Sequence, residues 1–230
     1  MSDSHCSRRT MLTAATAALA AGAVASTASA QDSAAPKSDK VKILAISGSA
    51  RKGMTTAAGL QACLEAAKAV SPAIEVELIE LAGMRFDPPV GEPKDDFPAL
   101  AAKLTDPGVG GIILGSPTYF ANMSGLMKSF LDRWTSIRKG FPLHDKVGGV
   151  LAVGGARNGG QELVNEGMKW VLMAMEMVLV GDGKPTCHRG ATLWNQTDDV
   201  SADEFGMGTA KALGTRVAET ALKMRGMGRK

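Results

Sequence analysis

Short apolar segments that end in glycine-containing or polar loops alternate with helical segments along most of this chain. The apolar pattern predicts strands over residues 41–47, 74–80, 110–114, 147–153 and 177–180. Helical patterns occupy residues 56–70, 122–137, 161–175 and 202–224. Strands that are separated by helices pair in parallel, with the helices on the two faces of the sheet. The order therefore predicts an α/β fold built on one parallel sheet.

The composition narrows the classes of function. With 45% hydrophobic and 21% charged residues the chain is globular rather than disordered, collagen-like or polytopic. Lys and Arg number 26 against 23 Asp and Glu, an excess too small to predict binding of nucleic acid. Cys6, Cys63 and Cys187 show no paired spacing, so neither a disulfide framework nor a four-cysteine metal site is expected. Demanding redox chemistry would therefore need a cofactor.

Residues 1–30 have the features of a twin-arginine signal peptide. Arg8 and Arg9 precede an Ala-rich run that ends in the small residues Ala28-Ser29-Ala30, a typical cleavage site. The alternative is a membrane anchor, but the apolar stretch is short and is interrupted by threonines and a glycine, so no stable membrane span is expected. We expect export to the periplasm, followed by a flexible leader over residues 31–40 and one domain over residues 41–230.

The loop between the first strand and the first helix, residues 48–56, predicts a phosphate site. In open parallel sheets ligands bind beyond the carboxyl ends of the strands, and this loop combines hydroxyls, backbone N–H groups and a helix N-terminus. It lacks the Gly-Lys-Ser/Thr ending of the nucleoside triphosphate loop and the G-x-G-x-x-G dinucleotide turn, so a monophosphate fits better. An ordinary Ser/Thr-capped helix start explains the same residues.

Two further loops follow predicted strands. Residues 115–122 place Tyr119 and Phe120 directly after a continuous apolar strand, where aromatic rings could contact a planar ligand; a hydrophobic staple on the next helix is the alternative. Residues 154–162 contain four glycines, which allow backbone N–H groups to approach a ligand closely, although a flexible surface loop would also be glycine-rich. All three loops are expected at one edge of the sheet.

The segments GSARKGMTT, GSPTYFANMSGLMKSFLDRW and GGARNGGQE together resemble the flavodoxin-like NADPH-dependent FMN reductases, especially the iron-sulfur flavoprotein and multimeric quinone reductase branches. The resemblance spans roughly residues 41–180. It implies a flavodoxin-like, doubly wound, five-stranded parallel sheet of order 2-1-3-4-5 and non-covalent FMN. It places the phosphate at Ser49, Arg51, Thr55 and Thr56, the ring against Pro117, Thr118, Tyr119, Phe120 and Asn122, and its far side against Gly155, Arg157, Gly159 and Gly160.

The function that the resemblance implies is an FMN-dependent oxidoreductase with NAD(P)H as co-substrate and a quinone, flavin or similar acceptor. The flavin would carry out the chemistry, so no catalytic side chain and no metal ligand are predicted. An exported one-electron carrier without NAD(P)H activity is the alternative, since nicotinamide nucleotides are not expected in quantity outside the cytoplasm. A flavin-free binding module is a third hypothesis. The family's multimeric habit and the Met-rich helix predict a homodimer or homotetramer.

The sequence departs from the iron-sulfur branch in one segment. Where that branch has a compact cysteine cluster, residues 86–96 contain no cysteine, which excludes an iron-sulfur cluster at that site. Residues 182–199 are longer than a simple link and are expected to form part of a substrate pocket or a subunit contact. They contain Cys187 and His188, but adjacent residues do not make a catalytic geometry and no third metal ligand is evident.

Overall fold

The computed structural model describes residues 39–226. The predicted signal peptide and nearly all of the predicted leader lie outside the described residues. None of the helices formed by residues 39–226 combines the length and the apolar character that a membrane crossing needs.

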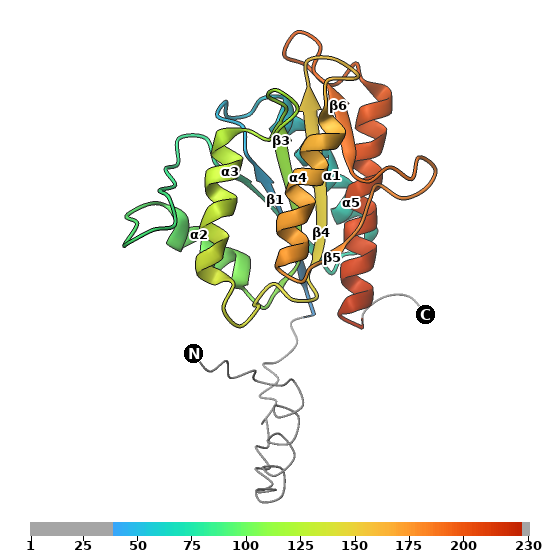
Figure 1. The fold of residues 1–230 in the computed structure, drawn as a ribbon. Coiled ribbons are helices and arrows are strands. Elements are labelled where there is room, and N and C mark those ends of the chain that lie inside the picture. The colour runs from blue at the N-terminus through green and yellow to red at the C-terminus, as the bar shows by residue number, and fades with distance from the viewer. Residues whose placement is uncertain (1–38, 227–230) are drawn as a thin grey trace, which may run out of the picture. The chain divides into compact units, whose positions relative to one another are not determined.

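A parallel sheet forms the centre of the molecule, with its strands in the order β2-β1-β3-β4-β5 (Figure 1). The strands are β1 Val41–Ser47, β2 Ile74–Glu80, β3 Val109–Pro117, β4 Val147–Gly154, β5 Val178–Leu179 and β6 Ala191–Trp194. The helices are α1 Thr55–Val70, α2 Phe97–Thr105, α3 Gly125–Asp132, the 3₁₀ helix η1 Arg133–Ile137, α4 Gln161–Ala174 and α5 Glu204–Met224. The order confirms the predicted flavodoxin-like fold.

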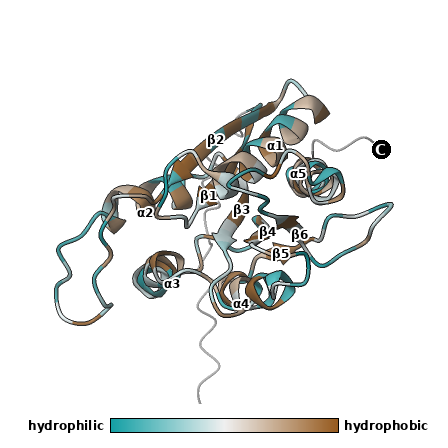
Figure 2. Ribbon diagram, turned by 90° about the horizontal axis from the view of Figure 1, so that it is seen from above, coloured by the Kyte–Doolittle hydropathy of each residue, from teal (hydrophilic) through white to brown (hydrophobic). Residues whose placement is uncertain are grey.

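Helices cover both faces of the sheet, because the strands are apolar on both sides. Along β1, Leu44 and Ile46 pack in the cluster that includes α2, α3 and α4, whereas Ile43 and Ala45 pack in the cluster with α1 and α5. Figure 2 shows these two groups of helices on opposite sides of the strands. Helices α1 and α5 pack closely, since a Cβ on Gly214 would lie 1.9 Å from the Cys63 carbonyl oxygen.

The fifth strand position is occupied by two short strands. β5 pairs with β4 at Val147–Gly148, and β6 pairs in parallel with β4 at Leu151–Gly154. The chain leaves the sheet between them and returns, so part of the segment 182–199 is a sixth strand rather than a simple link. The expected fifth strand over residues 177–180 is correspondingly reduced to two residues.

The other elements lie close to their expected ranges, with two differences. The helical pattern over residues 122–137 starts later than expected, at Gly125, because Ser124 caps the helix: its side chain accepts a hydrogen bond from Met127 N–H. From Arg133 the helix continues as the 3₁₀ helix η1. The sequence pattern does not predict helix α2, whose buried face is formed by Phe97, Leu100 and Leu104.

Candidate functional site

The β1–α1 loop, residues 48–54, lies at the carboxyl end of β1 and leads into α1. Thr55 and Thr56 are buried in the first turn of α1, and the Ser49 hydroxyl accepts a hydrogen bond from Arg51 N–H (3.1 Å). Among the described residues no side chain caps α1, and its first turn holds no acidic residue. The first turn of α1 is therefore uncapped, as binding of a phosphate there requires, whereas Gly53 N–H in the preceding loop donates to the Glu80 carboxylate (2.6 Å).

Arg51 forms an ion pair with Asp198 in this structure. Its Nη1 pairs with Asp198 Oδ1 at 2.8 Å, and both side chains are about half exposed. The hydrogen bond from Arg51, together with its charge, holds the pKa of the Asp198 carboxyl below its ordinary value. The pair joins the β1–α1 loop to the turn over residues 196–199, across 147 positions of sequence.

The turn after β3 presents the two predicted aromatic residues. Tyr119 and Asn122 exchange two backbone hydrogen bonds of 2.9 Å, and the residues between them, Phe120 and Ala121, have φ values of 49° and 58°. This two-residue turn with positive φ at both positions resembles the type I′ geometry that glycine and asparagine favour. Phe120 is fully exposed and Tyr119 about half exposed. Exposed aromatic residues beside a strained turn at the edge of the sheet are typical of a binding surface.

Ser124 joins this turn to the β1–α1 loop, and sequence reasoning did not select it. Its hydroxyl donates to the Gly48 carbonyl (2.6 Å), and its N–H donates to the Ser116 hydroxyl (2.9 Å). The sequence shows only a serine at the start of a helical pattern, which predicts a helix cap and not a contact with the β1–α1 loop.

The β4–α4 loop, residues 155–160, is held by a buried glutamine. Gln161 Oε1 accepts from Gly159 N–H (2.8 Å), and Nε2 donates to the Ala156 carbonyl (2.6 Å). Gly160 has φ +92°, and a Cβ added there would lie 2.8 Å from the Ala121 Cβ. Gly160 therefore lies in close contact with the turn after β3. That Gly155, Gly159 and Gly160 line one side of a flavin ring stays a prediction.

Arg157 is fixed by residues that come from β6 and α5. Its guanidinium pairs with the buried Asp203 carboxylate and lies over the Trp194 ring (5.7 Å) and the Phe205 ring (5.9 Å). Asp203 also accepts from Trp194 N–H (2.7 Å) and Gly206 N–H (2.9 Å). Burial opposes ionisation of Asp203, but these hydrogen bonds outweigh it and lower the pKa of the carboxyl. The sequence predicts a role for Arg157 but gives no signal for Asp203 as its partner.

Three buried polar atoms at this edge of the sheet need a partner. Within residues 39–226, Ser47 Oγ, Thr118 Oγ1 and Asn195 Oδ1 have no hydrogen-bond partner. These residues end or directly follow β1, β3 and β6, whose carboxyl ends lie at the upper end of the sheet in Figure 1. Buried polar groups are nearly always hydrogen-bonded, so the atoms fit a polar ligand. A flavin has hydrogen-bonding groups along its ring and a phosphate for the free start of α1, and the residues present therefore fit FMN.

Comparison with known proteins agrees with this geometry. Residues 41–192 match the family described as NADPH-dependent FMN reductase. The chain belongs to this family. It is 37% identical over 190 residues to an iron-sulfur flavoprotein of Methanocaldococcus jannaschii, covering 78% of this chain and 96% of that protein. A shorter match, 40% over 70 residues, covers 30% of this chain and 34% of an NAD(P)H dehydrogenase (quinone) of Paracoccus denitrificans.

Comparison with solved structures shows the flavodoxin-like fold. A flavodoxin, WrbA-like protein from Agrobacterium tumefaciens superposes with a TM-score of 0.56 at 18% identity, covering 80% of this chain and 98% of that one. Membership of the FMN reductase family makes this chain an FMN-dependent oxidoreductase.

The segment without cysteines, residues 86–96, is organised by aromatic packing and by a buried ion pair. Phe86 packs edge-on against Phe130 at 5.3 Å between ring centroids. Arg133 Nε donates to Asp95 Oδ2 (2.7 Å), and both side chains are buried. In the part of the chain that the structure describes, no three His, Cys, Asp or Glu residues are grouped so that they could hold a metal ion.

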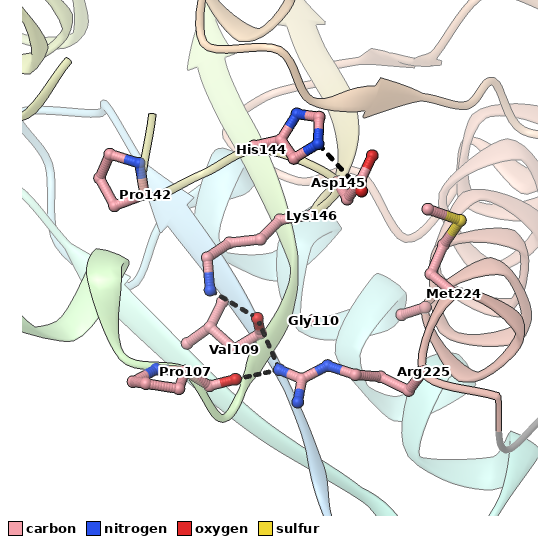
Figure 3. A pocket seen from close by; sticks show the side chains of 10 residues that line it. Pro107, Val109, Gly110, Pro142, His144, Asp145, Lys146, Met224 and Arg225 are labelled. Carbon is pink, nitrogen blue, oxygen red and sulfur yellow. Dashed lines mark hydrogen bonds and ion pairs between the residues drawn. The ribbon is translucent and has the colours of Figure 1, made fainter. Parts of the chain in front are cut away.

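A separate cavity of about 260 Å³ lies at the opposite edge of the sheet, at the amino ends of β3 and β4 (Figure 3). Lys146 Nζ donates to the carbonyls of Asp106 (2.9 Å) and Val109 (2.8 Å), and Arg225 also reaches the Val109 carbonyl. Burial lowers the pKa of Lys146 to about 8. Both side chains donate hydrogen bonds to backbone carbonyls at or before the start of β3. We therefore assign Lys146 and Arg225 a structural role, which is to satisfy these carbonyl groups.

Proposed function

We propose that the carboxyl edge of the sheet binds FMN and that the protein passes electrons from a reduced nicotinamide nucleotide to a quinone, a free flavin or a similar small acceptor. The observation that carries this proposal is the set of three buried, unpartnered polar atoms at the ends of β1, β3 and β6. The donor and the acceptor class are supported by the NADPH-dependent FMN reductase family and by the similarity to the NAD(P)H dehydrogenase (quinone) of Paracoccus denitrificans.

When bound, FMN would supply the electron-transfer chemistry. The chain's own residues bind and orient it. The free start of α1, with Ser49, Thr55 and Thr56, neutralises a phosphate, and Arg51 can reach it by leaving Asp198. Thr118 and Asn195 offer hydrogen bonds to the polar edge of the ring.

Flavin binding is tested by titrating the purified protein with FMN and following the quenching of flavin fluorescence. Replacing Arg51 and Thr56 together by alanine removes one charged donor and one hydroxyl, and we expect FMN affinity to fall about 10- to 100-fold. Lys68→Ala, at the far end of α1, is the charge-matched control and leaves the affinity unchanged. Equal affinities for all three proteins would contradict the phosphate position.

The electron donor is tested by anaerobic stopped-flow mixing of the FMN-loaded protein with NADH and with NADPH. We expect the flavin absorbance to bleach with at least one of them. The Arg8-Arg9 signal favours a second candidate, an exported one-electron carrier. Bleaching by dithionite but by neither nucleotide would support the carrier and overturn the reductase.

We propose that the twin-arginine sequence directs export of the folded, cofactor-loaded protein to the periplasm. Cell fractionation with a tag at the C-terminus tests this. Replacing Arg8 and Arg9 by lysine is expected to retain the protein in the cytoplasm, and an unchanged distribution would refute the proposal.

We also propose that the protein forms a homodimer or homotetramer. Leu163, Trp170 and Met173 are exposed on α4, with Trp170 65% exposed, which is unusual for large apolar residues on one helix. Light scattering after gel filtration measures the mass, and Trp170→Glu is expected to shift it toward the monomer. A monomeric wild-type protein would contradict this proposal.

A further inference from the structure

Residues 181–190, between β5 and β6, form a closed loop that carries Cys187. Asp182 N–H donates to the His188 carbonyl (3.2 Å), and the Thr186 hydroxyl donates to the Asp182 carboxylate. Cys187 N–H donates to the Gly183 carbonyl (2.5 Å), and Cys187 has φ +54°. These contacts hold the cysteine in a left-handed conformation that is uncommon for a residue with a Cβ. Its position is therefore set by the loop.

A small pocket lies between this loop, α4 and β6. Its volume is about 210 Å³, below the roughly 300–1,000 Å³ of pockets for drug-sized ligands. The lining residues are Glu162, Asn165, Glu166, Cys187, His188, Arg189, Gly190 and Thr192. The pocket is thus suited to a small, polar molecule.

The polar groups of the pocket favour a ligand that donates hydrogen bonds and carries positive charge. Asn165 is buried; its Nδ2 donates to the Ala191 carbonyl (3.0 Å), whereas its Oδ1 has no partner within residues 39–226. Glu166 is already paired with Lys169 (3.0 Å) and lies 3.5 Å from Arg189. Glu162 is an exposed acid in the first turn of α4, and no ion pair within residues 39–226 involves it. A primary ammonium group would satisfy both the amide oxygen and the free carboxylate.

Cys187 supplies a nucleophile at the same pocket. Its side chain is exposed, whereas Cys63, the other cysteine among residues 39–226, is buried. We propose that Cys187 is a thiol–disulfide exchange site for a small disulfide that carries a primary ammonium group. The Cys187 thiolate attacks one sulfur of the ligand, the original S–S bond breaks, and a Cys187–S–S–R bond forms. The other half leaves as a thiolate and takes up the proton that Cys187 released to solvent.

The experiment compares three disulfides on the full chain: cystamine, which carries ammonium groups, neutral 2-hydroxyethyl disulfide, and anionic 3,3′-dithiodipropionate. Peptide mapping by mass spectrometry measures the rate at each cysteine. Rates for the urea-unfolded protein correct for the intrinsic reactivity of the reagents. At Cys187 we compare the rate with cystamine to the rate with the neutral disulfide. We expect this rate ratio to be about tenfold higher in the folded protein than in the unfolded protein. Cys63 is expected to react only after unfolding.

Glu162→Gln removes the free carboxylate, and the extra preference for cystamine is expected to fall to about a third or less. Glu219→Gln, an exposed acid on α5, is the matched control and keeps the full preference. The same reagent preference in folded and unfolded protein, or an undiminished preference in Glu162→Gln, would overturn recognition of the ammonium group. Absence of a mixed disulfide at Cys187 with all three reagents would overturn the exchange site.

Discussion

Replacement of Asp203 by alanine tests whether this buried carboxylate joins three parts of the molecule. The side chain is 1% exposed and accepts hydrogen bonds from Trp194 N–H at the end of β6 and from Gly206 N–H at the start of α5, and it pairs with Arg157. Losing the helix cap costs about 1 kcal/mol. Leaving the Trp194 N–H unpaired costs about 1–3 kcal/mol. Arg157 is 40% exposed, so water replaces much of its pairing, which adds about 1 kcal/mol at most.

The expected loss of unfolding free energy is therefore about 2–5 kcal/mol. For a domain of this size each kcal/mol lowers Tm by about 2–4 °C, so the fall should be about 4–20 °C. Urea denaturation followed by circular dichroism measures the free energy, and a thermal scan measures Tm. Asp132→Ala, which removes an exposed acid paired only with Lys128, is the control and should cost less than about 1 kcal/mol. A change within about 0.5 kcal/mol for Asp203→Ala would refute the reasoning.

The pH dependence provides an independent test of the same carboxylate. Because the folded state lowers the pKa of Asp203, its contribution is fully present above the unfolded pKa of about 3.9. It is lost as the pH falls through the lower folded pKa. The difference in unfolding free energy between wild type and Asp203→Asn should thus be constant above about pH 5 and shrink below about pH 4. A difference that grows in acid would contradict the assigned charge state.

Three further substitutions test packing, charge burial and backbone strain. Gly214→Ala places a Cβ 1.9 Å from the Cys63 carbonyl oxygen and should lower the free energy of unfolding, measured by urea denaturation, by more than about 3 kcal/mol. Gly208→Ala, on the same helix but with open space around it, is the control and should leave this free energy unchanged or raise it by up to about 1 kcal/mol. Equal effects would refute the close approach. Burial lowers the pKa of Lys146 to about 8, so between about pH 8 and pH 10.5 the unfolded chain binds more protons at this residue than the folded chain does. Lys146 therefore makes the free energy of unfolding rise with pH in this range, and Lys146→Met should remove that rise. The same pH dependence of the unfolding free energy in wild type and Lys146→Met would show that Lys146 does not titrate in this range. Ala121→Gly relieves a φ of 58° and should raise Tm by about 2–4 °C, and a lower Tm would argue against the left-handed turn.

Much of the central sheet could be predicted from the sequence, because each buried strand is a short apolar run bounded by turn residues. The ranges expected for β1 and β2 match those observed. The missed elements carry weaker signals. β6 has only four residues, and α2 follows a proline-rich segment and contains Pro98. Tertiary packing, with Phe97 and Leu193 fully in the core, decides these elements more than local pattern.

The site was predictable in outline but not in its pairings. The rule that ligands bind beyond the carboxyl ends of parallel strands brings three distant loops to one edge. It does not say which side chains meet. Arg51 pairs with Asp198 across 147 positions and Arg157 with Asp203 across 46, and no periodicity relates residues so far apart. Residue type and strand order therefore predict the position of the site, and only the folded chain shows how its charges are neutralised.

The interrupted fifth strand connects the candidate flavin site to the Cys187 pocket. If β5 simply continued along β4, no loop would leave the sheet, and the Cys187 pocket would not exist. Because the chain instead returns as β6, Trp194 lies beneath the Arg157 guanidinium, and Asn195 brings an unpaired amide oxygen to the edge. The Phe205 ring packs at 5.7 Å from His188 of the loop and at 5.9 Å from the Arg157 guanidinium. One departure from a regular strand thus places residues at both sites, and shortening residues 181–190 should disturb both FMN affinity and disulfide exchange.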